Sequence, residues 1–362
     1  MAPRVLKTAL LPVAAAVASL AAAGCPHDWA SFESVPTEAP ADASTDVAQG
    51  QDEAATFEAG PTENAVFAAM KEKPTVLAAD AAGIVLLTLE GSVLACPHEG
   101  CALPTTIASN QHDPRSLAIG YGFVAWSSRG DNTVTRASRI PGASPAQQAK
   151  DPDVPDAVAL SATKVFFSVI AANNLIRSAG IRTCTPGVDC QLTAPSYSTF
   201  ADGNVTALKL ESADAFWLDP QNNRVVGCPI ATCEADYNKN VVLATEPVLP
   251  FALAVDADAI YYGSTLEGGS VRAVPRSRLA GDAGGGAHAL AKTVGSPERL
   301  AVTPSSVWFT DPAGIVSRVS RKGGAVTLVA KGLAQPTGIA VGGGWVYVAC
   351  TGDGRILRWK AD

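Results

Sequence analysis

Side chains that could do chemistry gather in five short turns rich in Asp, Asn and Gly. The turns span 127–132, 169–174, 218–223, 310–314 and 351–354. Their candidate ligand-binding residues are Arg129, Asp131, Asn173, Asp219, Asn222, Asp311, Asp353 and Arg355. Carboxylates and amides brought together by a fold could bind a small ligand or a divalent cation such as Ca²⁺ or Mg²⁺. The competing interpretation, which the sequence favours, is that tight turns require Asp, Asn and Gly for backbone reasons.

Catalytic signatures are missing from the sequence. It has no nucleophile elbow, no phosphate-binding loop and no HExxH motif. Only His112 lies on a segment expected to join two repeats, whereas His27, His98 and His288 lie elsewhere. A single histidine there cannot be a base oriented by a second histidine. We therefore predict no catalytic residues, no metal site and no cofactor, with Ca²⁺ or Mg²⁺ in a central funnel as the minor alternative.

The turns belong to a repeat that recurs seven times. Each copy opens with a triplet that begins and ends with an apolar residue, and a second apolar strand begins seven residues after the opening. The openings are Leu77, Leu117, Val158, Leu208, Leu253, Leu300 and Ile339. Successive openings are 39 to 50 residues apart, a period typical of propeller blades. The sequence therefore predicts an all-β fold, a seven-bladed β-propeller.

The last copy carries a family resemblance. Its segments GIAV (338–341), VYVA (346–349) and TGDGRI (351–356) resemble an NHL or YVTN-type propeller repeat, and looser copies cover 74–362. The resemblance implies the architecture found in bacterial lipoproteins of unknown function. Such repeats serve enzymes, scaffolds and surface proteins alike, so the resemblance does not specify an activity.

The propeller is expected to span 64–362 and to be closed by strands from both ends of this segment. The last repeat supplies three strands, whereas internal repeats have a fourth strand, as in 241–250 and 326–336. Residues 66–70 resemble these fourth strands and are predicted to complete the last blade, which removes a free strand edge. The five turns and the connections between blades should then share one face of the ring.

Residues 1–24 have the features of a signal peptide, with Arg4 and Lys7 before a long apolar run. The run ends in Ala-Ala-Gly-Cys at 22–25, which is similar to the lipobox of bacterial lipoproteins, although Ala22 stands where Leu is favoured. In that family the cysteine, here Cys25, becomes the acylated N-terminus. We predict a lipid anchor that holds the protein at a membrane without spanning it. Ordinary secretory cleavage and an uncleaved transmembrane anchor are the alternatives.

Residues 25–63 differ from the rest in composition. They contain nine acidic residues and no Lys or Arg, so we expect a disordered acidic tether. The chain carries a net charge of −7, but residues 64–362 hold 25 basic and 25 acidic residues. A neutral propeller lacks the basic surface that nucleic acids require, so we predict no nucleic-acid partner.

Six of the eight cysteines form three close pairs, each following the third strand of a repeat. The pairs are Cys96 with Cys101, Cys184 with Cys190, and Cys228 with Cys233. Paired cysteines near His98 could indicate zinc, but equivalent loops of different blades are spread around a ring. In an exported chain three local disulfides are the simpler prediction. Cys350 is expected to be a buried, inert thiol.

These features together predict a non-catalytic, exported surface lipoprotein. Its propeller is expected to act as a binding scaffold for an unidentified protein or cell-envelope component, as a monomer, in the periplasm or on the outer surface. The alternative is a metal-dependent extracytoplasmic lyase or hydrolase. That alternative requires at least three carboxylate or histidine side chains within about 5 Å near the central axis.

Overall fold

The computed structural model divides the chain into two units, 1–52 and 53–362, and all described residues belong to the second. The signal segment, Cys25, the tether and Asn173 therefore lie outside the described residues. The described ranges are 65–140, 142–150, 153–170, 180–185, 190–191, 198–202, 205–246, 250–265, 268–281, 286–293 and 295–362.

In the described part of the second unit, 28 strands form seven sheets of four antiparallel strands, and one sheet carries a fifth, two-residue strand. The innermost strands are β2 (Pro74–Asp80), β6 (Pro114–Gly120), β10 (Val154–Leu160), β15 (Ala207–Glu211), β19 (Pro250–Val255), β23 (Arg299–Val302) and β27 (Pro336–Gly342). The second strands are β3 (Gly83–Thr88), β7 (Phe123–Ser128), β11 (Val165–Ile170), β16 (Asp214–Asp219), β20 (Ala259–Ser264), β24 (Ser306–Asp311) and β28 (Trp345–Cys350).

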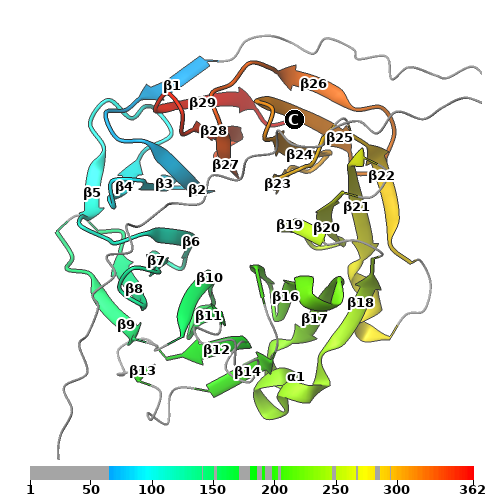
Figure 1. The fold of residues 1–362 in the computed structure, drawn as a ribbon. Coiled ribbons are helices and arrows are strands. Elements are labelled where there is room, and N and C mark those ends of the chain that lie inside the picture. The colour runs from blue at the N-terminus through cyan, green and yellow to red at the C-terminus, as the bar shows by residue number, and fades with distance from the viewer. Residues whose placement is uncertain are drawn as a thin grey trace, which may run out of the picture. The chain divides into compact units, whose positions relative to one another are not determined.

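The third and fourth strands complete each sheet toward the outside (Figure 1). The third strands are β4 (Val93–Cys96), β8 (Thr133–Ser138), β12 (Gly180–Cys184), β17 (Arg224–Pro229), β21 (Ser270–Pro275), β25 (Ile315–Ser320) and β29 (Arg355–Lys360). The fourth strands are β5 (Thr105–Ala108), β9 (Ala146–Lys150), β14 (Ser198–Asp202), β18 (Val241–Thr245), β22 (His288–Lys292), β26 (Thr327–Ala330) and β1 (Ala65–Ala69). The remaining elements are β13 (Cys190–Gln191), parallel to β9, α1 (Ile230–Ala235), and the 3₁₀ turns η1 (Pro220–Asn222), η2 (Tyr237–Lys239) and η4 (Arg276–Ala280).

The innermost strands contact one another in cyclic order, and the last of them, β27, contacts the first, β2. Figure 1 shows the seven sheets arranged around a common centre. All seven predicted openings lie in innermost strands. The second unit is a seven-bladed β-propeller, which confirms the fold predicted from the repeat.

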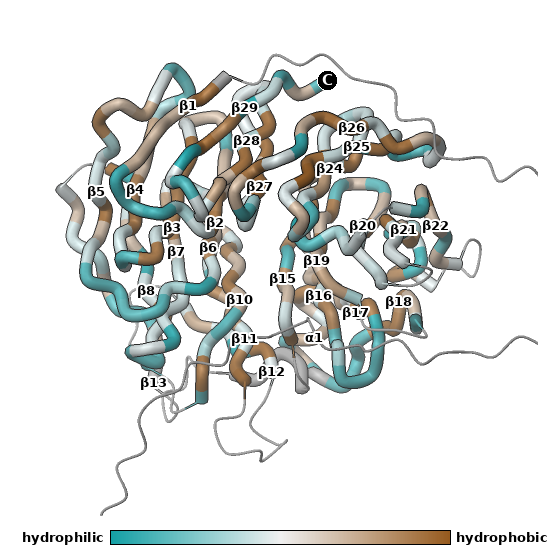
Figure 2. The backbone as a smooth tube through the Cα atoms, turned by 45° about the horizontal axis from the view of Figure 1, so that its top comes forward, coloured by the Kyte–Doolittle hydropathy of each residue, from teal (hydrophilic) through white to brown (hydrophobic). Residues whose placement is uncertain are grey.

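The hydrophobic core is divided among seven clusters, each formed by two adjacent sheets rather than by one central layer. Figure 2 shows apolar residues distributed through all seven sheets. Most aromatic side chains of the second strands are buried in these clusters, among them Trp126, Phe166, Trp217, Tyr262 and Tyr347. Burying one such side chain contributes roughly 1.5–3 kcal/mol, so the contacts between blades hold the ring together.

The seam of the ring joins the two ends of the second unit. β1 pairs antiparallel with β29, with Ala65 opposite Arg358 and Ala69 opposite Arg355. The amide of Met70 also donates a hydrogen bond to the carbonyl of Gly354 at 2.9 Å. The predicted closing strand is confirmed, with bounds one residue earlier than the sequence indicated.

Two of the three predicted cysteine pairs are disulfides, Cys96–Cys101 and Cys228–Cys233, with Cα–Cα distances of 5.1 and 6.1 Å. Both follow third strands, β4 and β17, and they lie in different sheets, as the disulfide prediction requires. The third pair includes Cys190, whose side chain lies outside the described residues.

Cys350 is a free thiol that is fully buried at the end of β28. Burial raises the pKa of the thiol to about 11. Because the thiolate is the reactive form, we expect alkylation at pH 8 to be about a hundredfold slower in the native protein than in the unfolded chain. Mass spectrometry of the labelled Cys350 peptide, with and without denaturant, measures this ratio. Equal labelling rates in both states would contradict a buried, inert thiol.

Candidate functional site

The ring has two distinct ends because turns alternate between them along each antiparallel sheet. One end carries the turns between second and third strands together with the connections between sheets, and we call it the loop face. The other end carries the turns between first and second strands and between third and fourth strands, including the disulfide loops; we call it the opposite face. The five sequence-predicted turns lie on the loop face where the structure describes them.

A central channel opens at the loop face and is lined by the innermost strands of all seven sheets. The cavity nearer the loop face has a volume of about 370 Å³, and the cavity nearer the opposite face has a volume of about 310 Å³. The two cavities share one residue or more from every innermost strand, so they are continuous. Both volumes lie at the lower end of the range of small-molecule sites.

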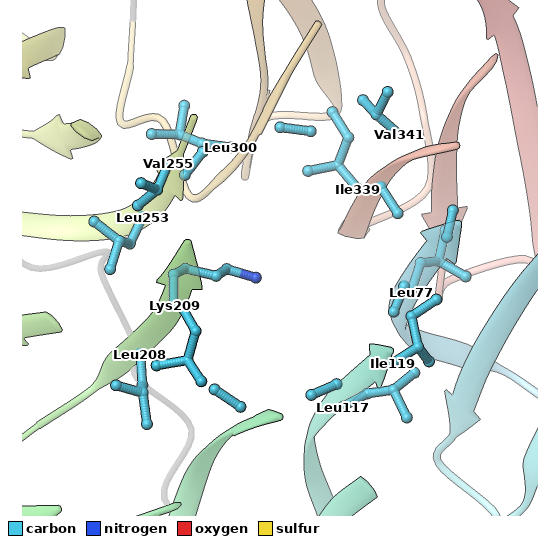
Figure 3. Close-up of a pocket in the computed structure, with 18 of the residues that line it drawn as sticks. Leu77, Leu117, Ile119, Leu208, Lys209, Leu253, Val255, Leu300, Ile339 and Val341 are labelled. Atoms are coloured by element: carbon cyan, nitrogen blue, oxygen red, sulfur yellow. The ribbon is translucent and has the colours of Figure 1, made fainter. Parts of the chain in front are cut away.

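The cavity nearer the opposite face is bordered by innermost-strand residues whose aliphatic side chains are mostly buried between blades, and Lys209 is the one charged residue among those that line it. Figure 3 shows the Lys209 side chain extending from β15 toward the open centre, with Leu77, Leu253 and Ile339 on the surrounding walls. The side chain remains accessible from the channel, yet protein surrounds it. This burial disfavours the ammonium form and lowers the pKa of Lys209 from its ordinary value, while access to channel water limits the effect.

Three arginines and one aspartate stand at the mouth of the channel. Arg129 donates from Nη2 to Asp156 Oδ1 at 2.7 Å, and Arg115 pairs with Asp113 at 3.0 Å. Arg299 donates from Nη1 to the carbonyl of Glu298 at 2.8 Å, and no carboxylate pairs with it among the described residues. Two of the three arginines at the mouth are therefore paired with carboxylates, and Arg299 is the one without such a partner among the described residues.

Asp131, one of the predicted ligand-binding residues, forms a hydrogen bond with a nearby residue of the loop face, His112. Its Oδ1 lies 2.7 Å from Nδ1 of His112, and this hydrogen bond lowers the pKa of the Asp131 carboxyl. His112 is largely exposed, which leaves its Nε2 available to solvent. The pair could accept a proton at Nε2, as a histidine held by a carboxylate does.

The other predicted aspartates are also engaged locally. Asp219 accepts from Arg224 Nη2 at 2.5 Å and from Asn222 Nδ2 at 2.8 Å. Asp353 accepts from Arg355 Nε at 2.7 Å, and this hydrogen bond lowers the pKa of the Asp353 carboxyl.

Asp311 is the least exposed of the predicted aspartates on the loop face after Asp219. Its Oδ1 accepts from the amide of Ala313 at 2.7 Å, while its buried Oδ2 has no hydrogen-bond partner. All four aspartates thus stabilise the turns in which they occur, as turn chemistry predicts.

The predicted residues do not meet at one point in the part of the chain that the structure describes. Of the seven that it describes, only Arg129 lines the channel. Within the described ranges, no group of three or more His, Cys, Asp or Glu side chains could hold a metal ion. The convergence of Asp131, Asp219, Asp311 and Asp353 on the axis is absent from the described structure.

Sequence reasoning missed the residues that do line the channel: Arg115, Asp156, Lys209 and Arg299. A signal for Lys209 was present in the repeat. The middle residue of the opening triplet is alanine in six blades, at Ala78, Ala118, Ala159, Ala254, Ala301 and Ala340, and lysine in the fourth. Because an innermost strand borders the channel, a long charged side chain at this position is placed to reach it.

Among the described residues, no helix is long and apolar enough to cross a membrane.

No family model matches the chain, and no curated protein matches it. Solved structures do match. Virginiamycin B lyase from Staphylococcus aureus has a TM-score of 0.61 at 14% identity, covering 83% of this chain and 99% of that one. Hydrazine synthase of Kuenenia stuttgartiensis has a TM-score of 0.63 at 12% identity, covering 81% and 97%. The WD40 propeller domain of Doa1 has a TM-score of 0.62 at 11% identity, covering 82% and 97%.

These similarities establish the propeller fold, and an NHL or YVTN-like repeat is consistent with them. The similar structures include a lyase, a synthase and a WD40 domain, so the fold does not select among functions.

Proposed function

We propose that the chain is a non-catalytic, exported binding protein, anchored to a membrane by a lipid on Cys25, whose loop face binds a protein or another cell-envelope component. The acidic tether gives the propeller reach from the membrane surface. The location is the periplasm or the outer surface of the cell. The propeller acts as a monomer in this proposal.

One observation carries the proposal: the loop face is preorganised. Its aspartates hold their own turns through Asp131–His112, Asp219–Arg224 and Asp353–Arg355. A rigid surface loses little conformational entropy when a partner binds, which favours recognition. The loop face also has a concave centre, because the channel opens there and Arg129 of the first turn lines it.

The test is co-purification of envelope components with the full chain after cross-linking. Asp131→Ala and Arg355→Ala alter the loop face without touching the channel lining. Lys164→Ala is the matched control, because it removes an ion pair of similar length and exposure on the opposite face, Lys164–Glu234 at 2.7 Å. We expect the two loop-face variants to lose the bound component at least tenfold relative to the control. Equal loss in all three variants, or in none, would contradict binding at the loop face.

A second candidate, metal-dependent lyase or hydrolase activity, has one supporting observation, the His112–Asp131 pair on the loop face, which supplies two of the three ligands that this function requires. If this candidate is right, Mg²⁺ or Ca²⁺ should bind at His112 and Asp131 and thereby raise the Tm of the full chain. His112→Ala should then abolish the rise, whereas His288→Ala, which removes another exposed histidine, should retain it. A Tm that neither cation changes would count against this candidate.

A further inference from the structure

We propose that a cavity between the fifth and sixth blades binds a small neutral aromatic molecule that carries one hydrogen-bonding group, a hydroxyl or an N–H. The cavity has a volume of about 290 Å³ and is lined by β22 of the fifth blade and by β24, β25 and β26 of the sixth. Figure 1 shows β22, β25 and β26 on the outer side of the ring. The site is therefore separate from the central channel, and it goes beyond the proposed loop-face function.

The cavity follows from one small side chain of the sixth blade. In all seven sheets the pairing of the third and fourth strands shifts at the same place, so the residues that follow the shift are equivalent. In the sixth blade the third-strand residue after the shift is Ser317, and it pairs with Leu328. The residues equivalent to Ser317 are all larger: Leu94, Thr135, Arg182, Val226, Arg272 and Leu357.

The equivalent residues show what Ser317 leaves unfilled. Leu94, Val226 and Leu357 each pack in a core cluster that their blade shares with the preceding one. Ser317 lines the cavity at the junction of its own blade with the preceding, fifth blade. Because a serine side chain is shorter than leucine, valine or arginine, this junction keeps a hollow where the corresponding junctions are filled.

The walls of the cavity are mainly apolar. Phe309, Ile315, Val326 and Leu328 line it, and Phe309 is 3% exposed. Ile315 and Leu328 are only partly buried and belong to none of the seven core clusters. Apolar cavities of roughly half this volume bind benzene. An aromatic ligand would cover the two aliphatic side chains and pack against the Phe309 ring.

Ser317 also supplies a polar group inside the cavity. The residue is 3% exposed, and its hydroxyl makes no hydrogen bond to another described residue. Buried hydroxyl groups are normally hydrogen-bonded, and a hydroxyl oxygen can accept from a ligand O–H or N–H. A ligand with one such group would therefore satisfy Ser317 while its ring covers the apolar walls.

The charges around the cavity favour a neutral ligand. Asp311 lines the end nearer the loop face, is 4% exposed, and has no hydrogen-bond partner for its Oδ2 among the described residues. Lys292 and Lys331 also line the cavity and are exposed. The carboxylate would repel an anion, and the two ammonium groups would repel a cation. Either ion would also have to leave water for apolar walls.

The experiment is calorimetric titration of the purified full chain with three ligands of similar size: indole, benzoate and benzylammonium. Indole is neutral and has one N–H group. We expect it to bind with a Kd of roughly 0.1–1 mM, which is reasonable for so small a ligand. Benzoate and benzylammonium should bind at least tenfold more weakly, because each carries a charge.

Three variants place the binding in this cavity. Ser317→Leu introduces the side chain that Leu94 and Leu357 carry at equivalent positions. It should weaken indole binding at least tenfold and leave Tm unchanged or raised, because it fills the hollow. Leu328→Gln makes one wall polar and should weaken binding at least threefold. Thr135→Leu, at the equivalent position of the second blade, is the matched control and should bind indole as the wild type does.

The proposal is overturned if indole does not bind at its solubility limit, or if either ion binds as tightly as indole. It is also overturned if Ser317→Leu and Leu328→Gln bind indole as the wild type does. Leu328 is partly exposed on an outer strand, so its variant decides the question even if Ser317→Leu does not fold. No envelope component takes part in this titration, so its failure is separate from a failure of the loop-face proposal.

Discussion

Replacing Phe67 by alanine is expected to lower the free energy of unfolding by about 3 kcal/mol and to loosen the seam of the ring. Phe67 is the largest side chain that the closing strand β1 contributes to the core, and it is 8% exposed. Its ring packs edge-on against Tyr347 at a centroid distance of 5.1 Å, and the Arg358 guanidinium lies over it. The variant therefore removes the contact that ties the start of the ring to its end.

Denaturant unfolding measures the loss of stability, and hydrogen exchange of the β29 amides reports whether the seam opens. Val66→Ala is the matched control on the same strand, because Val66 is 54% exposed and should cost within about 0.5 kcal/mol. If the β1–β29 pairing closes the ring, hydrogen exchange of the β29 amides should be faster in Phe67→Ala and unchanged in Val66→Ala. Similar costs for both variants would show that β1 is not part of the cooperative fold.

Replacing Glu246 by alanine is expected to destabilise the protein by about 3–5 kcal/mol. Glu246 follows β18 of the fourth blade, is 5% exposed, and accepts from Tyr262 Oη and from Arg272 Nε, the latter at 3.1 Å. Both partners belong to the fifth blade. Burial raises the pKa of Tyr262, so this hydroxyl stays protonated as the donor. Removing the carboxylate leaves a part-buried guanidinium and a buried hydroxyl without their shared acceptor.

Thermal and denaturant unfolding of three variants, Glu246→Ala, Tyr262→Phe and Glu234→Ala, separate the contribution of the buried network from that of one hydrogen bond and that of a more exposed ion pair. Tyr262→Phe removes one hydrogen bond and should cost about 1 kcal/mol. Glu234→Ala removes the more exposed ion pair to Lys164 and should cost less than about 1 kcal/mol. If Glu246→Ala costs no more than Glu234→Ala, the buried network does not couple the fourth and fifth blades.

The architecture could be predicted because each blade repeats one local pattern. The opening triplets placed every innermost strand, and the likeness of 66–70 to internal fourth strands identified the closing strand. Both are one-dimensional signals, since strands are set by alternation and turns by residue type. The burial of the aromatic side chains of the second strands could be predicted from the same repeat, because each blade packs against a neighbour on both of its faces.

The site could not be predicted in the same way. The aspartates of the turns were visible, but their side-chain directions were not, and each one binds a neighbour such as Arg224 or Arg355. Lys209 lies 50 residues beyond Ala159, its counterpart in the preceding blade, and only ring closure brings it opposite the innermost strands of the other six blades. Glu246 likewise acquires its role from residues of the next blade. Side-chain direction and contacts between blades are properties of the ring rather than of the repeat.

The central claim is that the loop face, and not the opposite face, meets the partner. A photo-reactive amino acid placed at Leu89 or at Tyr121 of the full chain in cells tests this claim most directly. Leu89 follows β3 on the loop face and is 60% exposed, whereas Tyr121 follows β6 on the opposite face and is 63% exposed. The account predicts a discrete cross-linked component, identified by mass spectrometry, from position 89 and none from position 121. A component captured only from position 121, or equally from both, would contradict it.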